Sequence, residues 1–148
     1  MLIFFFWHGV CASWAYTIEI RNAMHDRSIQ FNAEIVLIDE DVGFGSCLKF
    51  LLKEHGIKVE HSADFFDILV LLKETTDVLM IDTDLLHREG FHHLDNIRKH
   101  FPSTKVILTA SGSRTLGNVC GIRRGAVACL LKFFPQDRWL RVVQQALC

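Results

Sequence analysis

From residue 33 to the end of the chain, short runs of apolar residues alternate with longer segments in which apolar residues recur every three or four positions. The runs are typical of buried strands, and the longer segments are typical of helices that pack through one side. Such an alternation predicts parallel strands joined by helices. The predicted strands are EIVLI (34–38), IKVEH (57–61), DVLMI (77–81), KVILT (105–109) and AVACLL (126–131).

Five helices are expected around these strands. Ser62 is a candidate N-cap for the second helix, and Pro135 and Asp137 would open the last one. The third helix would cover residues 91–100 and the fourth residues 114–123. The inward-facing residues would be Phe44, Leu48, Leu51 and Leu52 in the first helix, Phe65, Leu69 and Leu72 in the second, and Leu140, Val143 and Leu147 in the last.

Right-handed crossovers between such elements give an α/β fold, a doubly wound five-stranded parallel sheet in the flavodoxin-like order 2-1-3-4-5 with helices on both faces. In an open sheet of this kind, a functional site lies at the carboxyl ends of the strands, beside the point where the strand order reverses. The polar residues that matter should therefore directly follow the apolar runs.

Polar residues do stand at these positions. In the expected order, the first, third, fourth and fifth strands are neighbours, so side chains at their ends would meet at one edge of the sheet. Each residue alone has an ordinary explanation as a turn, cap or solvated residue, but the combination is hard to obtain from turn chemistry. The residues are Asp39 and Glu40 after the first strand, Asp82 after the third, Thr109 at the end of the fourth and Lys132 after the fifth.

These residue types together suit phosphoryl transfer. Adjacent carboxylates repel one another, and a hard divalent ion such as Mg²⁺ relieves that repulsion and binds oxygen ligands. With the ion held by Asp39 and Glu40, Asp82 could remain ionised and attack a phosphoryl group. The ammonium of Lys132 and the hydroxyl of Thr109 could then stabilise the charge that develops on the phosphoryl oxygens.

Composition narrows the class of protein. A chain of 148 residues with 50% hydrophobic residues suits one domain, and a net charge of -1 gives no overall attraction to nucleic acid. Residues 96–148 nevertheless hold nine of the 16 Lys and Arg and one acid, Asp137. The five cysteines form no CxxC pair, which argues against a disulfide framework or a zinc site and suggests a cytoplasmic protein.

Residues 2–18 are almost wholly apolar, and no Lys or Arg precedes them as in a signal peptide. The stretch is only marginally long enough to span a bilayer as a helix. A membrane anchor, an extra element docked on an apolar surface, and an extension upstream of a natural start at Met24 all remain open. We expect residues 1–32 to be an extension without catalytic function and residues 33–148 to form the domain.

The residues at the strand ends resemble those of the receiver domain of bacterial two-component response regulators. The similar stretches are IVLIDED (35–41), DVLMIDTDLLHREGF (77–91), KVILTAS (105–111) and GAVACLLKFF (125–134). The resemblance implies a phosphoryl-accepting switch rather than an enzyme, with Asp82 as the phosphoacceptor. It also implies that Thr109 moves toward the phosphoryl group and that Lys132 contacts it. Mg²⁺ would be held by Asp39, Glu40, Asp82 and the backbone carbonyl of Asp84.

Several residues depart from the receiver pattern. Leu86 and Phe133 stand where receivers commonly have proline, and Cys129 stands where they have an aromatic switch residue. Without proline, the peptide after Lys132 is expected to be trans and the ammonium to be aimed differently. We interpret Cys129 as a small core residue. Asp84 would point its carboxylate toward the site and alter the lifetime of the phosphoryl group.

The resemblance also implies partners. A sensor histidine kinase or a phosphotransfer protein would supply the phosphoryl group, and a downstream protein or a second copy of the chain would bind the switched form. Direct binding of nucleic acid is not expected, because the sequence has no recognition motif and no interleaved aromatic residues. The alternative is a pseudo-receiver that binds proteins without being phosphorylated. The chain ends at Cys148 directly after the last helix, so it is either a stand-alone receiver or a fragment. The fourth helix, fifth strand and fifth helix would form the output surface, with Arg114, Arg123, Arg124, Arg138 and Arg141.

Overall fold

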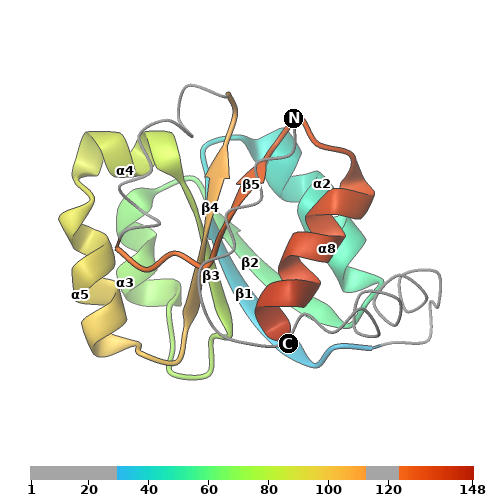
Figure 1. The fold of residues 1–148 in the computed structure, drawn as a ribbon, viewed down its shortest axis with the longest axis horizontal. Helices are drawn as coiled ribbons and strands as arrows, with labels where there is room; N and C mark the ends of the chain where they lie inside the picture. The colour runs from blue at the N-terminus through green and yellow to red at the C-terminus, as the bar shows by residue number, and fades with distance from the viewer. Residues whose placement is uncertain (1–29, 113–123) are drawn as a thin grey trace, which may run out of the picture.

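The structure is a computed structural model that describes residues 30–112 and 124–148. Its centre is a five-stranded sheet in the order β2-β1-β3-β4-β5 with all neighbouring strands parallel (Figure 1). The predicted fold class and strand order are therefore confirmed. The strands are β1 (Ala33–Ile38), β2 (Ile57–Ser62), β3 (Val78–Asp82), β4 (Lys105–Ala110) and β5 (Ala128–Leu131).

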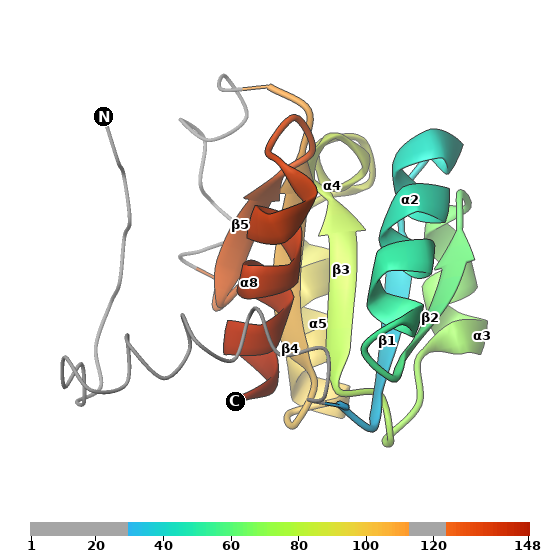
Figure 2. The same ribbon diagram turned by 90° about the vertical axis from the view of Figure 1, so that its right-hand side faces the viewer.

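Helices cover both faces of the sheet. Figure 2 shows α2 (Val42–Lys53) and α8 (Gln136–Leu147) side by side on one face. The 3₁₀ helix η1 (Phe65–Asp67) and the helices α3 (Ile68–Leu71), α4 (Thr83–Glu89) and α5 (His92–His100) follow their strands on the other face (Figure 1). Successive strand residues point to opposite faces, so they divide between two hydrophobic clusters.

The long, regularly patterned helices lie where the sequence predicts them. In α2, Phe44 and Leu48 are buried, and in α8, Leu140 and Val143 are buried. The predicted helix over residues 91–100 corresponds to α5. The last strand is shorter than expected, because pairing with β4 begins at Ala128.

The predicted second helix is wrong in its start and at one of its three inward residues, Leu69, whereas Phe65 and Leu72 are buried as predicted. Ser62 still belongs to β2, and Asp64 caps the following turn by accepting a hydrogen bond from the N–H of Phe66 at 2.8 Å. The chain then forms η1, in which residues three apart share a face. Phe65 and Ile68 are consequently buried, whereas Leu69 is 83% exposed.

A short helix that the sequence did not predict, α4, begins directly after β3. The side chain of Asp82 caps it by accepting a hydrogen bond from the N–H of Asp84 at 2.9 Å. Leu85 and Leu86 are buried on its inner side, and the helix ends before Gly90, whose φ of 108° favours glycine. Seven residues with one adjacent apolar pair are too few to show a helical period.

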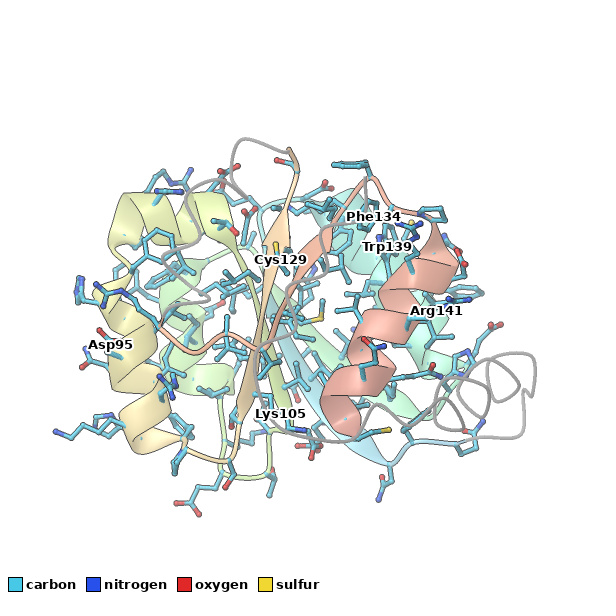
Figure 3. The ribbon with its side chains drawn as sticks, viewed as in Figure 1. Asp95, Lys105, Cys129, Phe134, Trp139 and Arg141 are labelled. Carbon is cyan, nitrogen blue, oxygen red and sulfur yellow. The ribbon has the colours of Figure 1, made fainter. Side chains whose placement is uncertain are left out.

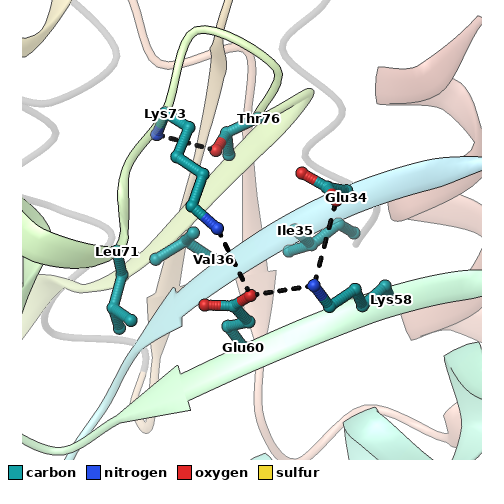
Figure 4. Close-up of a pocket in the computed structure, with 8 residues that line it drawn as sticks. All are labelled: Glu34, Ile35, Val36, Lys58, Glu60, Leu71, Lys73 and Thr76. Atoms are coloured by element: carbon teal, nitrogen blue, oxygen red, sulfur yellow. Dashed lines mark hydrogen bonds and ion pairs between the residues drawn. The ribbon is translucent and has the colours of Figure 1, made fainter.

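Charged side chains lie along β2, one of the two edge strands of the sheet. Lys58 lies 3.0 Å from Glu60 on β2 and 3.9 Å from Glu34 on β1, and Lys73 lies 3.8 Å from Glu60 (Figure 4). Charged side chains on an edge strand discourage pairing with another chain. The pocket beneath them has a volume of about 10 Å³, which is room for about one water.

Two predicted features lie outside the described residues. They are the apolar stretch at residues 2–18 and the fourth helix at residues 114–123, so the role of the N-terminal extension and the expected domain boundary stay predictions. In the ranges 30–112 and 124–148, the structure holds no helix with the length and apolar character that crossing a membrane requires.

Candidate functional site

Four of the polar residues at the strand ends point to the same face of the sheet. Each lies two positions beyond a strand residue of the hydrophobic cluster under α2 and α8. Because side chains alternate along a strand, residues two apart point the same way. The pairs are Leu37 and Asp39, Met80 and Asp82, Ile107 and Thr109, and Leu130 and Lys132.

Lys132 joins the two aspartates at this edge. Its ammonium lies 2.6 Å from Oδ1 of Asp39 and 2.9 Å from Oδ2 of Asp82. The hydroxyl of Thr109 donates to the other oxygen of Asp39 at 2.8 Å. Asp39 and Thr109 are fully buried, and the Lys132 side chain is 9% exposed. The structure thus brings together four of the predicted site residues.

The aim of Lys132 differs from the expectation. The peptide between Lys132 and Phe133 is trans, as predicted, but the ammonium still reaches Asp82. The absence of proline after Lys132 therefore does not turn the ammonium away from the site.

The charges of this cluster are not balanced. Burial raises the pKa of Asp39, and the nearby charge of Asp82 raises it further, although the hydrogen bond from Lys132 opposes this shift. Burial alone would lower the pKa of Lys132, but its hydrogen bonds to the two carboxylates raise it. Two buried carboxylates share one ammonium, so the site favours a further positive charge, either a proton or a metal cation.

Glu40 lies apart from this cluster. It follows Asp39, so the alternation of side chains turns it toward the opposite face, where α4 lies. There it forms a bidentate ion pair with Arg88, at 2.5 Å and 3.2 Å. The hydrogen bond from Arg88 lowers the pKa of Glu40, and the same contact raises the pKa of Arg88.

Asp84 occupies the first turn of α4 with an exposed side chain. Its N–H donates to Oδ1 of Asp82, so the two oxygens of Asp82 have different partners, the helix and Lys132. In an α-helix, a backbone carbonyl points along the axis toward the residue four positions ahead. The carbonyl of Asp84 is therefore directed along α4.

Sequence reasoning missed several supporting residues. His61, at the end of β2, donates from Nε2 to the backbone carbonyl of Asp39 at 2.8 Å. A side chain at Gly45 would collide with the His61 ring. The hydroxyl of Thr83 donates to the carbonyl of Thr109 at 2.9 Å. Of these residues, only His61 could have been anticipated from the sequence, because it lies near the end of the strand that pairs with β1.

The donor chemistry at Asp39 and Asp82 fits Mg²⁺. Two buried carboxylates with a deficit of positive charge supply hard oxygen ligands, and Mg²⁺ is often held by one or two carboxylates with waters in the remaining positions. In the part of the chain that the structure describes, no group of three or more His, Cys, Asp or Glu is arranged around a metal position. Glu40 could become a metal ligand only after its ion pair with Arg88 is broken.

Cys129, labelled in Figure 3, is partly buried and packs against the cluster under α4 and α5, whereas the next residue, Leu130, belongs to the cluster on the opposite face. Burial raises the pKa of its thiol to about 11. The residue thus lies at the margin of the core, as a small, partly buried side chain.

The predicted output arginines have different surroundings. Arg114 and Arg123 lie outside the described residues, and Arg124 forms an ion pair with Asp95 of α5. Arg138 and Arg141 are exposed on α8, and the Arg138 guanidinium lies 4.9 Å from the centre of the Phe134 ring. Figure 3 shows Arg141 on the side of α8 that faces away from the sheet.

Comparison with known sequences agrees with this geometry. The profile of the response regulator receiver domain matches residues 35–144. The transcriptional regulatory protein CpxR of Klebsiella pneumoniae is 35% identical over 107 residues, which are 72% of the chain and 45% of CpxR. CpxR of Escherichia coli K12 has the same identity and coverage. The chain therefore spans less than half the length of these relatives.

Solved structures show the same fold. A response regulator from Thermotoga maritima has a TM-score of 0.68 at 23% identity and covers 79% of the chain, with 98% of its own length matched. NtrX from Brucella abortus has a TM-score of 0.69 at 26% identity over 78% of the chain and 26% of NtrX.

Proposed function

The chain belongs to the response regulator receiver domain family, and on that premise we propose that Asp82 accepts a phosphoryl group in a reaction that requires Mg²⁺. Membership of the family implies a part in a two-component phosphorelay. The observation that carries the proposal is the Lys132 ammonium, which lies within 2.9 Å of carboxylate oxygens of both Asp39 and Asp82.

The chain's own residues have defined tasks in this reaction. An oxygen of Asp82 forms a bond to phosphorus while the bond between phosphorus and the donor breaks, and the donor leaves with the bonding electrons. The Lys132 ammonium, which binds the Asp82 carboxylate before the reaction, would bind the negatively charged phosphoryl oxygens after it. Thr109 can exchange its hydrogen bond to Asp39 for one to a phosphoryl oxygen. The product is an acyl phosphate on Asp82.

Mg²⁺ would supply the positive charge that the site lacks. Asp39 and Asp82 would hold it through their carboxylates, with Glu40 joining after release from Arg88. For the backbone carbonyl of Asp84 to serve as a ligand, the first turn of α4 would have to loosen, because that carbonyl now points along the helix. Metal binding is thereby linked to the start of α4.

On this proposal the protein is a switch and not an enzyme that turns over an external substrate, apart from slow self-catalysed phosphorylation and dephosphorylation. The donor would be a sensor histidine kinase or a phosphotransfer protein. A downstream protein, or a second copy of the chain, would bind the surface that includes Arg138 and Arg141. If Arg138→Glu and Arg141→Glu together leave binding of the downstream partner unchanged, this surface is not the output surface.

The proposal is tested with a small phosphodonor such as acetyl phosphate. Intact-mass spectrometry should show one phosphoryl adduct in the presence of Mg²⁺ and none with EDTA. Asp82→Asn should abolish the adduct, whereas the control Asp67→Asn, which changes an aspartate on η1, should retain it. A wild-type protein that never forms the adduct would favour the alternative of a pseudo-receiver that only binds proteins.

A further inference from the structure

The backbone of Lys132 is fixed to β4, because its N–H donates to the carbonyl of Ala110 at 2.9 Å, so the place of the ammonium depends on what holds the side chain. Phe133, the next residue, is 62% exposed, so it packs too weakly to fix the loop. A lysine ammonium sits on a flexible four-carbon stem. The two aspartates bind the ammonium, and residues packed around the stem and the tip can restrict it further.

Trp139 fixes the backbone directly before Lys132. It lies in the first half of α8, is buried, and donates from Nε1 to the carbonyl of Leu131 at 3.2 Å. The N–H of Phe134 donates to the same carbonyl at 3.0 Å. Figure 3 shows Trp139 and Phe134 at the end of α8 that lies nearest this loop. A buried indole N–H needs an acceptor, and here the acceptor precedes the functional lysine.

Phe44 supports the ammonium itself. Its buried ring comes from α2, and the Lys132 ammonium lies 5.5 Å from the ring centre. At that distance a cation is attracted to an aromatic face. The Phe44 ring in turn meets Trp139 edge to face, with centres 5.0 Å apart and an interplanar angle of 82°. Rings from two helices thus connect the backbone of the loop with the tip of the lysine.

We infer that Phe44 and Trp139 are positioning residues that keep the Lys132 ammonium between Asp39 and Asp82. Trp139 holds the carbonyl of Leu131, and Phe44 offers its ring face to the cation. The two rings thereby aim the lysine in a chain whose following residue, Phe133, points into solvent. The consequence for phosphorylation rests on the proposed function, but the position of the ammonium does not.

Ordinary core packing is the competing explanation. Phe44 and Trp139 both belong to the hydrophobic cluster under α2 and α8, which also contains the fully buried Leu48. Loss of any of these side chains would lower stability. A positioning role requires in addition that Lys132 responds to Phe44 and Trp139 and not to Leu48, whose aliphatic side chain offers neither an N–H nor a ring face.

The test observes the lysine directly, by NMR of the full chain labelled with ¹⁵N-lysine and free of metal. The readout is the rate at which the Lys132 ammonium protons exchange with water, with Lys132→Met identifying the signal. Trp139→Phe, which removes the N–H, and Phe44→Leu, which removes the ring, should each speed exchange on the order of threefold to tenfold. Phe44→Tyr, which keeps a ring face, should restore slow exchange.

Leu48→Ala is the matched control, because it removes buried volume from the same cluster. It should lower the thermal midpoint at least as much as the other variants and leave Lys132 exchange unchanged. Equal exchange rates in Leu48→Ala and in both ring variants would overturn the inference. If Phe44→Leu does not fold, Phe44→Met takes its place.

Phosphorylation rates provide the second readout. With acetyl phosphate and Mg²⁺, the two ring variants should modify Asp82 several-fold more slowly than Leu48→Ala. If the wild-type protein is never phosphorylated, the proposed function fails, whereas the exchange rates still decide whether Phe44 and Trp139 position the lysine.

Discussion

The carboxylate of Asp82 has two partners that belong to different roles. One oxygen caps α4 through the N–H of Asp84, and the other binds the Lys132 ammonium. An aspartate after a strand suits a helix cap and a phosphoacceptor equally well, and here it makes both kinds of contact. The residue type alone could not distinguish a helix cap from a phosphoacceptor. The positions of Thr109 and Lys132 at neighbouring strand ends favoured the phosphoacceptor.

The ion pair between Glu40 and Arg88 could not be predicted from the sequence. Arg88 lies on α4, a helix too short to show a period, so nothing placed its guanidinium beside the end of β1. In contrast, the convergence of Asp39, Asp82 and Lys132 depends only on strand order and on alternation along strands, which the sequence does show.

Arg88 should weaken the binding of Mg²⁺ because it competes for Glu40 and adds a positive charge. Arg88→Ala should lower the Kd for Mg²⁺ about two- to fivefold, as expected for loss of an exposed ion pair. Arg88→Lys keeps the charge without the bidentate geometry, so its Kd should lie between the two. Isothermal titration calorimetry measures the three values, and equal Kd values would show that Glu40 is free to bind metal in the wild type.

The backbone N–H of Asp84 donates to Oδ1 of the proposed phosphoacceptor, and its side chain is exposed. We propose that the carboxylate orients water against the acyl phosphate or tunes the bound metal. Asp84→Asn should therefore change the dephosphorylation rate severalfold. The rate follows from loss of the phosphoryl adduct by mass spectrometry after the donor is removed. An unchanged dephosphorylation rate would show that Asp84 does not influence the lifetime of the phosphoryl group.

Cys129 should be chemically inert in the folded protein, because its thiol has a pKa of about 11. At pH 8, iodoacetamide should modify the exposed Cys47 and Cys148 and leave Cys129 untouched until urea is added. The raised pKa stabilises the fold below the ordinary thiol value of 9.0, and this contribution is lost as the pH rises through 11. Peptide mapping that finds Cys129 alkylated as fast as Cys47 under native conditions would contradict the raised pKa of its thiol.

At the scale of elements, length decided which predictions succeeded. The helices α2, α5 and α8 extend over nine to twelve residues, enough for the apolar spacing to define one inward face. The helices α3 and α4 have four and seven residues, and caps and neighbouring turns set their position. The 3₁₀ turn before α3 changes the phase, which a pattern of constant helical period cannot reproduce.

The broken second helix makes a prediction for two leucines that a regular helix would both bury. Leu69 is exposed and Leu72 is buried. Leu69→Lys should change the free energy of unfolding by less than about 0.5 kcal/mol, as surface substitutions do. Leu72→Lys should cost more than about 3 kcal/mol, because it places a charge in the core. Urea unfolding measures both free energies, and similar losses in the two variants would indicate that Leu69 is buried, as in a regular helix.

At the scale of the whole molecule, the two faces of the sheet carry different tasks. The cluster under α2 and α8 continues into the site through Asp39, Asp82, Thr109 and Lys132. The opposite face holds α4 and Arg88, which binds Glu40. Strand order and the handedness of crossovers made this layout predictable from residue 33 onward. The first 29 residues carry no repeated pattern that relates them to the sheet.

Side chains from four strand ends are proposed to act as one phosphoryl-accepting site at Asp82. The most direct measurement is localisation of the phosphoryl group by peptide mass spectrometry, after reaction with acetyl phosphate and Mg²⁺ and reduction of the acyl phosphate with borohydride. We expect Asp82 to be the modified residue and Lys132→Met to slow its modification greatly. A phosphoryl group on another residue, or modification of Asp82 that proceeds equally well without Lys132, would contradict this proposal.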